Sequence, residues 1–190
     1  MNWLVFIACG LVVAALDGGF SAALSVGPFR PALLPAVVAF VALHGPRRTT
    51  LWAAFAAGIL VDLLQPSIGS AGVPFHVLGP NALGYAFGAT AVLLLRSMVF
   101  RRNPLTLGFM TAVLSIGITL VTAAVFSARR FWSDESPPWQ GEAVQPWILR
   151  QFVADLLSGL WAIPLAWPLN ASIERWDFFS VGRRPWRRPA

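Results

Sequence analysis

The sequence is poor in the side chains on which most enzymes and metal sites depend. It has one cysteine, two histidines and eight acidic residues in a chain of 190. A lone Cys9 excludes an intramolecular disulfide, and together with two histidines it cannot build a typical catalytic zinc site. No phosphate-binding glycine loop is present, and Ile68 stands where a Gly-x-Ser-x-Gly motif around Ser70 needs glycine. We therefore expect no enzymatic activity, no metal and no cofactor.

Charge is scarce as well, and this points to the class of protein. Charged residues make up 12% of the sequence, apolar residues make up 57%, and the mean hydropathy is +0.68. These values lie outside the range of an ordinary soluble domain. Six spans of about 20 residues each would leave no room for a second domain. We predict an all-α, polytopic membrane protein with a single integral membrane domain over residues 1–190.

Apolar runs separated by turn-forming residues predict six transmembrane helices. The runs cover residues 2–20, 31–43, 50–64, 74–95, 105–127 and 147–169. The second and third are shorter than the roughly 17 to 25 residues of a spanning helix, so they must borrow flanking residues or tilt little. Pro164 and Pro168 should kink the last span. The N-terminal run lacks a basic flank, so we do not expect a cleaved signal peptide.

The distribution of arginine predicts the orientation. On the six-span arrangement ten of the 14 basic residues, all arginine, lie on one side. That side is cytoplasmic by the positive-inside rule, and both termini lie there. Short clusters between apolar runs do not fit a nucleic-acid-binding face. The basic C-terminal tail either sets the topology or binds anionic lipid or a cytoplasmic partner. The ten are Arg47, Arg48, Arg96, Arg101, Arg102, Arg175, Arg183, Arg184, Arg187 and Arg188; the four are Arg30, Arg129, Arg130 and Arg150.

Three acidic residues fall inside predicted spans: Asp17, Asp62 and Asp155. A carboxylate at bilayer depth costs at least about 2.5 kcal/mol, so such residues usually have a reason to be there. Because successive helices alternate in direction, all three should lie in the outer half of the membrane, in one layer. Either each is a helix-end polar group that reaches water, or the three form a polar cluster or partner-binding site neutralised by Arg30 or Arg150.

Small residues at helical spacing predict close helix packing. Gly84 and Gly88 lie four apart in the fourth span, and Ala54 and Gly58 lie four apart in the third. Such spacing serves either packing within the chain or contact with another membrane protein. Asp62 follows Gly58 by four residues and shares its helix face. We expect its carboxylate to accept hydrogen bonds in a helix contact, either from loop amides at 67–72 or from donors on the fourth helix such as Asn81.

From Arg30 to Arg102 the chain resembles the bacterial rod shape-determining protein MreD family. The resemblance is carried by the Arg30-Pro31 start of an apolar run, by Ala57-Gly-Ile-Leu-Val-Asp-Leu-Leu64, by the Gly-Tyr helix Asn81-Ala-Leu-Gly-Tyr-Ala-Phe-Gly88 and by Arg101-Arg102. The Gly-x-x-x-Asp-Leu-Leu element is its most specific part. The chain departs from the family in a longer loop after Leu64, with Pro74 and Pro80, and in the long stretch 129–145.

The resemblance implies a non-enzymatic scaffold of the cell-elongation machinery in the bacterial cytoplasmic (inner) membrane. Such a protein binds MreC and supports MreB, RodA and a penicillin-binding protein during rod-shape maintenance and peptidoglycan synthesis. The family is also similar in fold to the substrate-binding subunits of energy-coupling-factor transporters. A small-molecule-binding subunit of a vitamin-type transporter is therefore the alternative. A transporter subunit should hold an enclosed pocket with convergent polar groups, whereas a scaffold should show an apolar groove or face that a partner fills.

Overall fold

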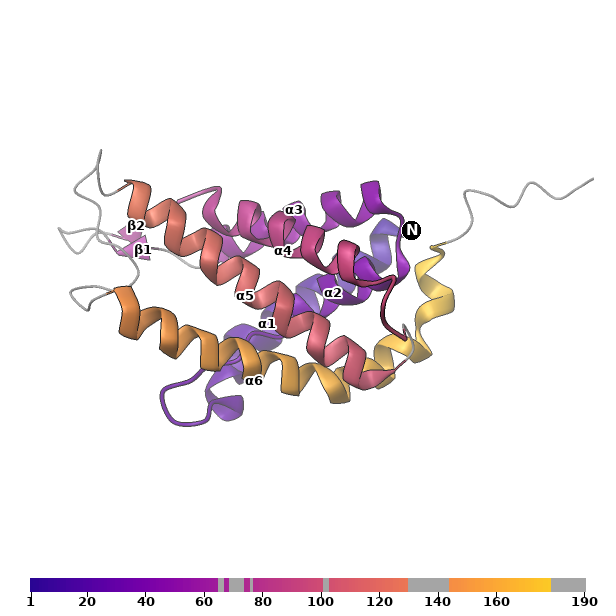
Figure 1. Ribbon diagram of the computed structural model, residues 1–190. Helices are drawn as coiled ribbons and strands as arrows, with labels where there is room; N and C mark the ends of the chain where they lie inside the picture. The colour runs from indigo at the N-terminus through magenta and orange to yellow at the C-terminus, as the bar shows by residue number, and fades with distance from the viewer. Residues whose placement is uncertain (65–66, 69–73, 76, 101–102, 130–143, 179–190) are drawn as a thin grey trace, which may run out of the picture.

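Six apolar segments form α-helices in the computed structural model, and Figure 1 shows them packed in one bundle. The structure describes residues 1–64, 67–68, 74–75, 77–100, 103–129 and 144–178. The helices are α1 (Trp3–Leu24), α2 (Leu34–His44), α3 (Arg47–Leu64), α4 (Pro80–Leu95), α5 (Pro104–Arg129) and α6 (Val144–Ala171). A 3-10 helix, η1 (Ile173–Trp176), follows α6, and β1 (Ser67–Ile68) pairs antiparallel with β2 (Pro74–Phe75). The predicted all-α class is confirmed for the described residues, with this small hairpin as an addition.

The fourth helix starts later than the apolar run that predicted it. We expected a span over residues 74–95, but Pro74–Phe75 is strand β2 and α4 begins at Pro80. Gly79 makes the turn into the helix with a φ of 124°, a backbone conformation that favours glycine. Proline suits the first helical position because the amide that it lacks has no helical partner there. The apolar run therefore includes residues of the connection between α3 and α4.

Helix length bears directly on the predicted six spans. α5 and α6 contain 26 and 28 residues, and both are long and apolar enough to cross a membrane. α2 contains 11 residues, or about 16 Å at about 1.5 Å per residue, against a hydrocarbon core of about 30 Å. The apolar stretches of α1 and α4 are also shorter than a full span. The described part of the chain therefore contains two helices that are long and apolar enough to span a membrane, and the count of six remains a prediction.

The short helix α2 forms the centre of the bundle. All of its 11 residues are buried, and it contacts α1, α3, α4, α5 and α6. Figure 1 shows it enclosed by the longer helices. Pro35 lies in its first turn, and Gly45 followed by Pro46 ends it. A helix that is apolar on every side must be covered on every side, and here the other five helices provide the cover.

Glycines bring α4 and α5 into backbone contact. A Cβ atom added at Gly88 would lie 2.6 Å from the carbonyl oxygen of Leu114, and one added at Gly84 would lie 3.0 Å from Cα of Ile118. Real Cβ atoms rarely or never come so close, so a larger residue at either position would push the helices apart. Both glycines of the predicted packing pair thus serve a contact within the chain.

Large apolar side chains cover the outside of the helices, whereas small residues fill much of the inside. In α3, for example, Ala53 and Ala57 are buried, while Trp52 and Phe55 are exposed. A helix packed in water usually has the opposite distribution, with its apolar stripe inside and polar residues outside. Further exposed large apolar residues include Leu4, Ile7, Leu11, Leu83, Phe87, Phe109, Leu120, Phe152, Leu160 and Trp167.

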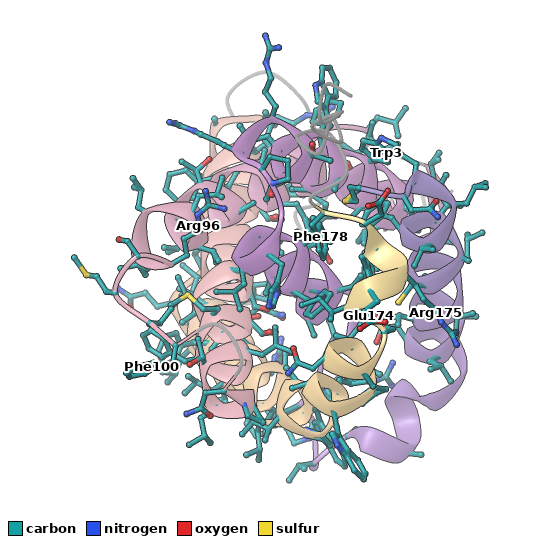
Figure 2. The ribbon with its side chains drawn as sticks, turned by 90° about the vertical axis from the view of Figure 1, so that its right-hand side faces the viewer. Trp3, Arg96, Phe100, Glu174, Arg175 and Phe178 are labelled. Atoms are coloured by element: carbon teal, nitrogen blue, oxygen red, sulfur yellow. The ribbon has the colours of Figure 1, made fainter. Side chains whose placement is uncertain are left out.

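The start of the chain and η1 meet at the end of the bundle opposite the β1–β2 hairpin (Figure 1). The amide of Asn2 donates a hydrogen bond of 2.8 Å to the carbonyl oxygen of Trp176. Trp176 is buried against Phe40 of α2 and against Phe178, with ring centroids 5.3 and 5.7 Å apart. Figure 2 looks onto this end, where Arg96 and Phe178 are labelled. The beginning of α1 and the end of α6 therefore lie on the same side.

Candidate functional site

The carboxylate of Asp62 closes the joint between α3 and α4. It is 2% exposed and lies near the end of α3. Its Oδ2 accepts hydrogen bonds from the amides of Gly79 at 2.8 Å and Ala82 at 3.3 Å. Its Oδ1 accepts from the backbone amide of Asn81 at 3.1 Å and from the side-chain amide at 2.9 Å. The first amides of a helix have no helical acceptor and form its positive end, so Asp62 caps α4 from another helix.

One of the two donor groups predicted for Asp62 is thereby identified. Asn81 on the fourth helix donates twice to the carboxylate. The other predicted group, the loop amides at 67–72, lies mostly outside the described residues. The cap fixes the direction in which the chain enters α4 after Gly79.

Gly58 lets the start of α4 come close enough for this capping. A Cβ atom at Gly58 would overlap Cα of Ala82 and lie 2.6 Å from the carbonyl oxygen of Asn81. Gly58 and Asp62 are four residues apart and share one helix face. The Gly-x-x-x-Asp element therefore works as a unit. The glycine sets the distance between the helices, and the carboxylate binds the amides brought within reach.

Asp17 makes the same kind of joint between α1 and α2. Its Oδ1 accepts from the amide of Leu33 at 2.7 Å and its Oδ2 from the amide of Leu34 at 3.0 Å. The neighbouring amide of Ala32 donates to Oγ of Ser158 on α6 at 2.9 Å. No sequence motif predicted a role for Ser158, although a hydroxyl residue beside a glycine in an apolar helix was a usable signal. The start of the central helix is thus tied to both α1 and α6.

Arg96 caps the opposite end of α2. Its Nη1 donates to the carbonyl oxygens of Ala42 at 3.2 Å and Gly45 at 2.7 Å. A cation at a helix C-terminus satisfies unpaired carbonyls and complements the negative end of the helix dipole. The arginine pattern predicted only that Arg96 lies in a cytoplasmic loop. A local pattern cannot identify acceptor carbonyls that are 51 and 54 positions away in the sequence. The buried helix α2 therefore has an acid at its start and a base at its end.

Asp155 is buried in α6 and faces α5. It is 5% exposed, and its Oδ2 accepts a hydrogen bond of 2.7 Å from Oγ1 of Thr119. Gln151, one turn earlier on the same helix, is a second side-chain partner. Both partners are neutral. Asp155 thus joins α5 to α6 through a side chain, whereas Asp17 and Asp62 bind backbone amides.

Tyr85 of α4 links the three predicted acids in space. It is 3% exposed, and it lies within electrostatic range of the carboxylates of Asp17, Asp62 and Asp155. The charges of three acids that are far apart in the sequence therefore act on one buried tyrosine. Acids that only reached water at helix ends would not be 2% and 5% exposed, as Asp62 and Asp155 are.

The two arginines predicted to neutralise these acids are both exposed. Arg30 lies in the connection between α1 and α2. Arg150 lies on the exposed face of α6, whereas Asp155 lies on its buried face. Amides and hydroxyl groups donate hydrogen bonds to the acids. Helix capping, which does not need a cation, accounts for Asp17 and Asp62.

Gly108 and Gly159 form a close helix contact that we did not predict from the sequence. A Cβ atom at either glycine would lie 2.7 Å from the carbonyl oxygen of the other. The contact joins α5 to α6. On α6, Gly159 directly follows Ser158 and comes four residues after Asp155. Gly108 has a small residue, Ala112, four positions later, the same spacing that marked Ala54 and Gly58. Gly159 has no small residue at that spacing, so its signal was an isolated glycine inside a long apolar helix.

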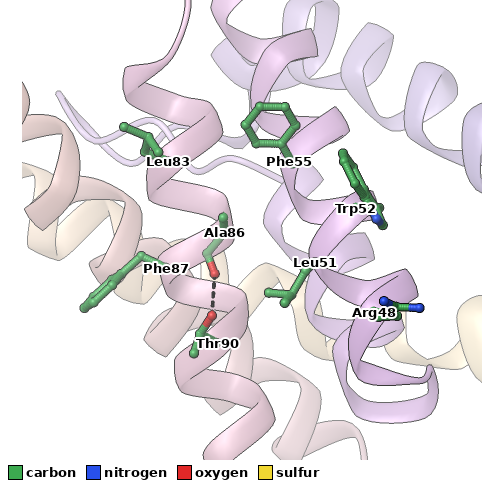
Figure 3. Close-up of a pocket in the computed structure, with 8 residues that line it drawn as sticks. All are labelled: Arg48, Leu51, Trp52, Phe55, Leu83, Ala86, Phe87 and Thr90. Atoms are coloured by element: carbon green, nitrogen blue, oxygen red, sulfur yellow. Dashed lines mark hydrogen bonds between the residues drawn. The ribbon is translucent and has the colours of Figure 1, made fainter.

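An open groove runs along the outer face of α3 and α4 (Figure 3), with a volume of about 720 Å³. Its lining is apolar apart from two side chains. The hydroxyl of Thr90 donates to the carbonyl oxygen of Ala86 at 2.8 Å, so it is satisfied within its own helix. The charged residue in the lining is Arg48, at one end. The walls include Trp52 and Phe55 from α3 and Leu83 and Phe87 from α4.

Within the described ranges no three His, Cys, Asp or Glu side chains gather in a way that could hold a metal ion. The Ile68-Gly-Ser-Ala-Gly72 segment and His76, which we weighed as a nucleophile loop and base, lie almost wholly outside the residues that the structure describes. No protein-family model matches the chain, and neither a curated protein sequence nor a solved structure matches it. The function must therefore be argued from the joints, the acids and the outer surface.

Proposed function

We propose that this chain is a multi-pass protein of the bacterial cytoplasmic membrane, with six transmembrane helices and both termini in the cytoplasm. Three observations support this proposal. α5 and α6 have spanning length, and large apolar side chains are exposed on every long helix. The free backbone groups at both ends of α2 have partners from other helices. Backbone groups at membrane depth require such partners because hydrocarbon provides none.

Within the membrane, the proposed role is that of a non-enzymatic scaffold of the cell-elongation machinery, similar to MreD and binding MreC. The observation that carries this proposal is the joint formed by Gly58 and Asp62. These residues belong to the Gly-x-x-x-Asp-Leu-Leu element, the most specific part of the resemblance. In the structure they hold the start of α4 through four hydrogen bonds and a backbone contact.

A joint of this kind suits a scaffold. It fixes the end of α3 against the first turn of α4 without performing any chemistry. Helix ends that are held in place give a partner a constant surface, so less conformational entropy is lost when the partner binds. MreC would bind this end directly. MreB, RodA and a penicillin-binding protein would be joined through the assembled complex.

The alternative is a small-molecule-binding subunit of a vitamin-type transporter, and one observation favours it. Tyr85 lies in the interior within range of the carboxylates of Asp17, Asp62 and Asp155. Their negative charges would attract a ligand with a cationic group. The open apolar groove on α3 and α4 favours the scaffold instead, because it lacks the convergent polar groups of a small-molecule site.

One experiment separates the two functions. The protein is purified through an affinity tag in mild detergent from a rod-shaped bacterium that expresses it, and the co-purifying proteins are identified by mass spectrometry. Recovery of MreC, reduced in an Asp62→Leu variant at equal membrane expression, supports the scaffold. Recovery of an ABC-type ATPase module without MreC would overturn it in favour of the transporter.

A further inference from the structure

We infer that the groove between α3 and α4 binds one anionic phospholipid of the cytoplasmic leaflet, with its phosphate at Arg48 and an acyl chain along the groove. The inference rests on the membrane orientation proposed above and goes beyond it. It does not depend on MreC. Its basis is the distribution of charge and apolar surface in and beside the groove (Figure 3).

Positive charge is concentrated at one end of the groove. Arg47 and Arg48 are both exposed and form the first two residues of α3. The first amides of a helix are its positive end and favour a phosphate even without side chains. Two guanidinium groups at the same place add the charge-assisted contacts that phosphate prefers. Basic pockets between helices on the cytoplasmic side are a recognised kind of anionic-lipid site.

The order of side chains along α3 follows the order of groups in a phospholipid. Arg48 comes first, Trp52 lies one turn further in and is 66% exposed, and Phe55 follows another turn later. These positions share one face of the helix. An indole ring suits the headgroup level, and a phenyl ring suits hydrocarbon. On α4 the apolar wall is continued by Phe87 and Leu83, which are 56% and 54% exposed.

The length of the groove favours an acyl chain over a partner helix. Its lining extends from Arg48 to Phe55 on α3 and from Leu83 to Thr90 on α4, which is about 10 Å along each helix at about 1.5 Å per residue. A transmembrane helix of about 30 Å would be held over only a third of its length. A flexible chain anchored at its phosphate needs no longer surface.

The test uses the purified full-length protein in mild detergent and native mass spectrometry with added phosphatidylglycerol or phosphatidylcholine. The wild-type protein should retain one phosphatidylglycerol at concentrations at which phosphatidylcholine is lost. Arg48→Gln should weaken retention at least ten-fold, because the exposed side chain supplies charge to the phosphate but little to the fold. Arg175→Gln is the matched control, since Arg175 is an exposed arginine on the same proposed side and away from the groove.

A second variant tests the acyl chain. Ala86→Trp fills the groove from α4 and should abolish retention while Arg48 is intact; Thr90→Phe does the same if Ala86→Trp does not purify as a folded monodisperse protein. Equal weakening by Arg48→Gln and Arg175→Gln, or unchanged retention when the groove is filled, would overturn the inference. A cross-linker at Phe87 that captures a protein helix instead of lipid would overturn it too. These outcomes leave MreC recovery unaffected, so failure of the lipid site is distinguishable from failure of the scaffold.

Discussion

Asn81 donates twice to the same carboxylate oxygen of Asp62, through its backbone amide at 3.1 Å and its side-chain amide at 2.9 Å. The other oxygen accepts from Gly79 and Ala82. All four of these groups are N–H donors. Position 62 therefore requires an acceptor on both sides, a condition that only a carboxylate meets fully.

Asp62 variants should rank by the acceptors that they keep. Asp62→Leu leaves the donors of Gly79, Asn81 and Ala82 unpaired, at about 1 to 3 kcal/mol for each group that stays buried. Asp62→Asn keeps one acceptor oxygen but turns its NH₂ group toward other N–H donors. The function of this variant should therefore lie between that of Asp62→Leu and that of the wild-type protein. The measurement is complementation of rod shape in a bacterium that lacks its own MreD, together with MreC recovery at matched membrane expression.

Complementation at the wild-type level by a normally inserted Asp62→Leu protein would show that this carboxylate has no part in the function. Leu94→Ala is a suitable control, because Leu94 is 70% exposed near the end of α4, far from the capped start of that helix, and should leave both readouts unchanged.

Gly58→Ala should destabilise the chain, although alanine normally favours a helix. The added methyl group would overlap Cα of Ala82, and overpacking of this kind costs about 1 to 3 kcal/mol. At Gly10 in α1 an added Cβ meets nothing within 4 Å, so Gly10→Ala should be neutral or stabilise by up to about 1 kcal/mol. The midpoint of unfolding in mixed detergent is measured for both variants and for the wild-type protein. If Gly10→Ala lost as much stability as Gly58→Ala, the close contact at Gly58 would be refuted.

Apolar runs were sufficient to predict the all-α class and the approximate place of each helix. The physical reason is that a run of apolar residues bounded by glycine and proline has few alternatives to a helix. The same reasoning extended the fourth helix to residue 74, because Pro74–Phe75 is as apolar as the helix that follows it. Hydropathy measures transfer from water and does not distinguish an apolar strand from a helix.

The joints between helices were predictable only where both parts lie on one helix face. Gly58 and Asp62 are four residues apart, so their shared face follows from the helix period. Arg96 and Ser158 bind the ends of α2 from 51 and 126 positions away, and no local pattern contains that information. A single sequence shows which residues inside apolar helices need partners, but the packing of helices decides which partners they find.

The caps of α2 should contribute independently to stability. Asp17→Ala leaves the amides of Leu33 and Leu34 without their acceptor, and Arg96→Met leaves the carbonyl oxygens of Ala42 and Gly45 without their donor. Each change should cost about 1 to 3 kcal/mol. The two ends of α2 are about 16 Å apart, beyond the distance at which mutational effects usually couple, so the double variant should lose the sum within about 0.5 kcal/mol. The free energy of unfolding in mixed detergent is measured for the wild-type protein, the two single variants and the double variant, and the losses are compared. A double variant no less stable than the worse single variant would mean that α2 unfolds as soon as either cap is lost.

The last prediction concerns the side of the membrane on which each end of α2 lies. α2 has 11 residues, so a helix of this length could enter the membrane and return instead of crossing. We expect it to cross, because its start is held by Asp17 and Ser158 and its end by Arg96, and because protein surrounds it on every side. Its exposed flanks, Pro28 and Pro46, should then lie on opposite sides.

Labelling of single cysteines tests this crossing in the full-length protein. Cys9→Ser removes the one native cysteine, and Pro28→Cys or Pro46→Cys then adds one reactive position. A membrane-impermeant maleimide applied to intact cells should label Cys at position 28 and spare position 46, which should react only after permeabilisation. Phe100 follows α4 and is 85% exposed. Phe100→Cys should be labelled like position 46, since α3 and α4 form an antiparallel pair that returns the chain to the proposed cytoplasmic side.

Labelling of positions 28 and 46 from the same side would mean that α2 does not cross the membrane. The proposed orientation of Arg48, of the groove and of the three acids would then have to be abandoned as well.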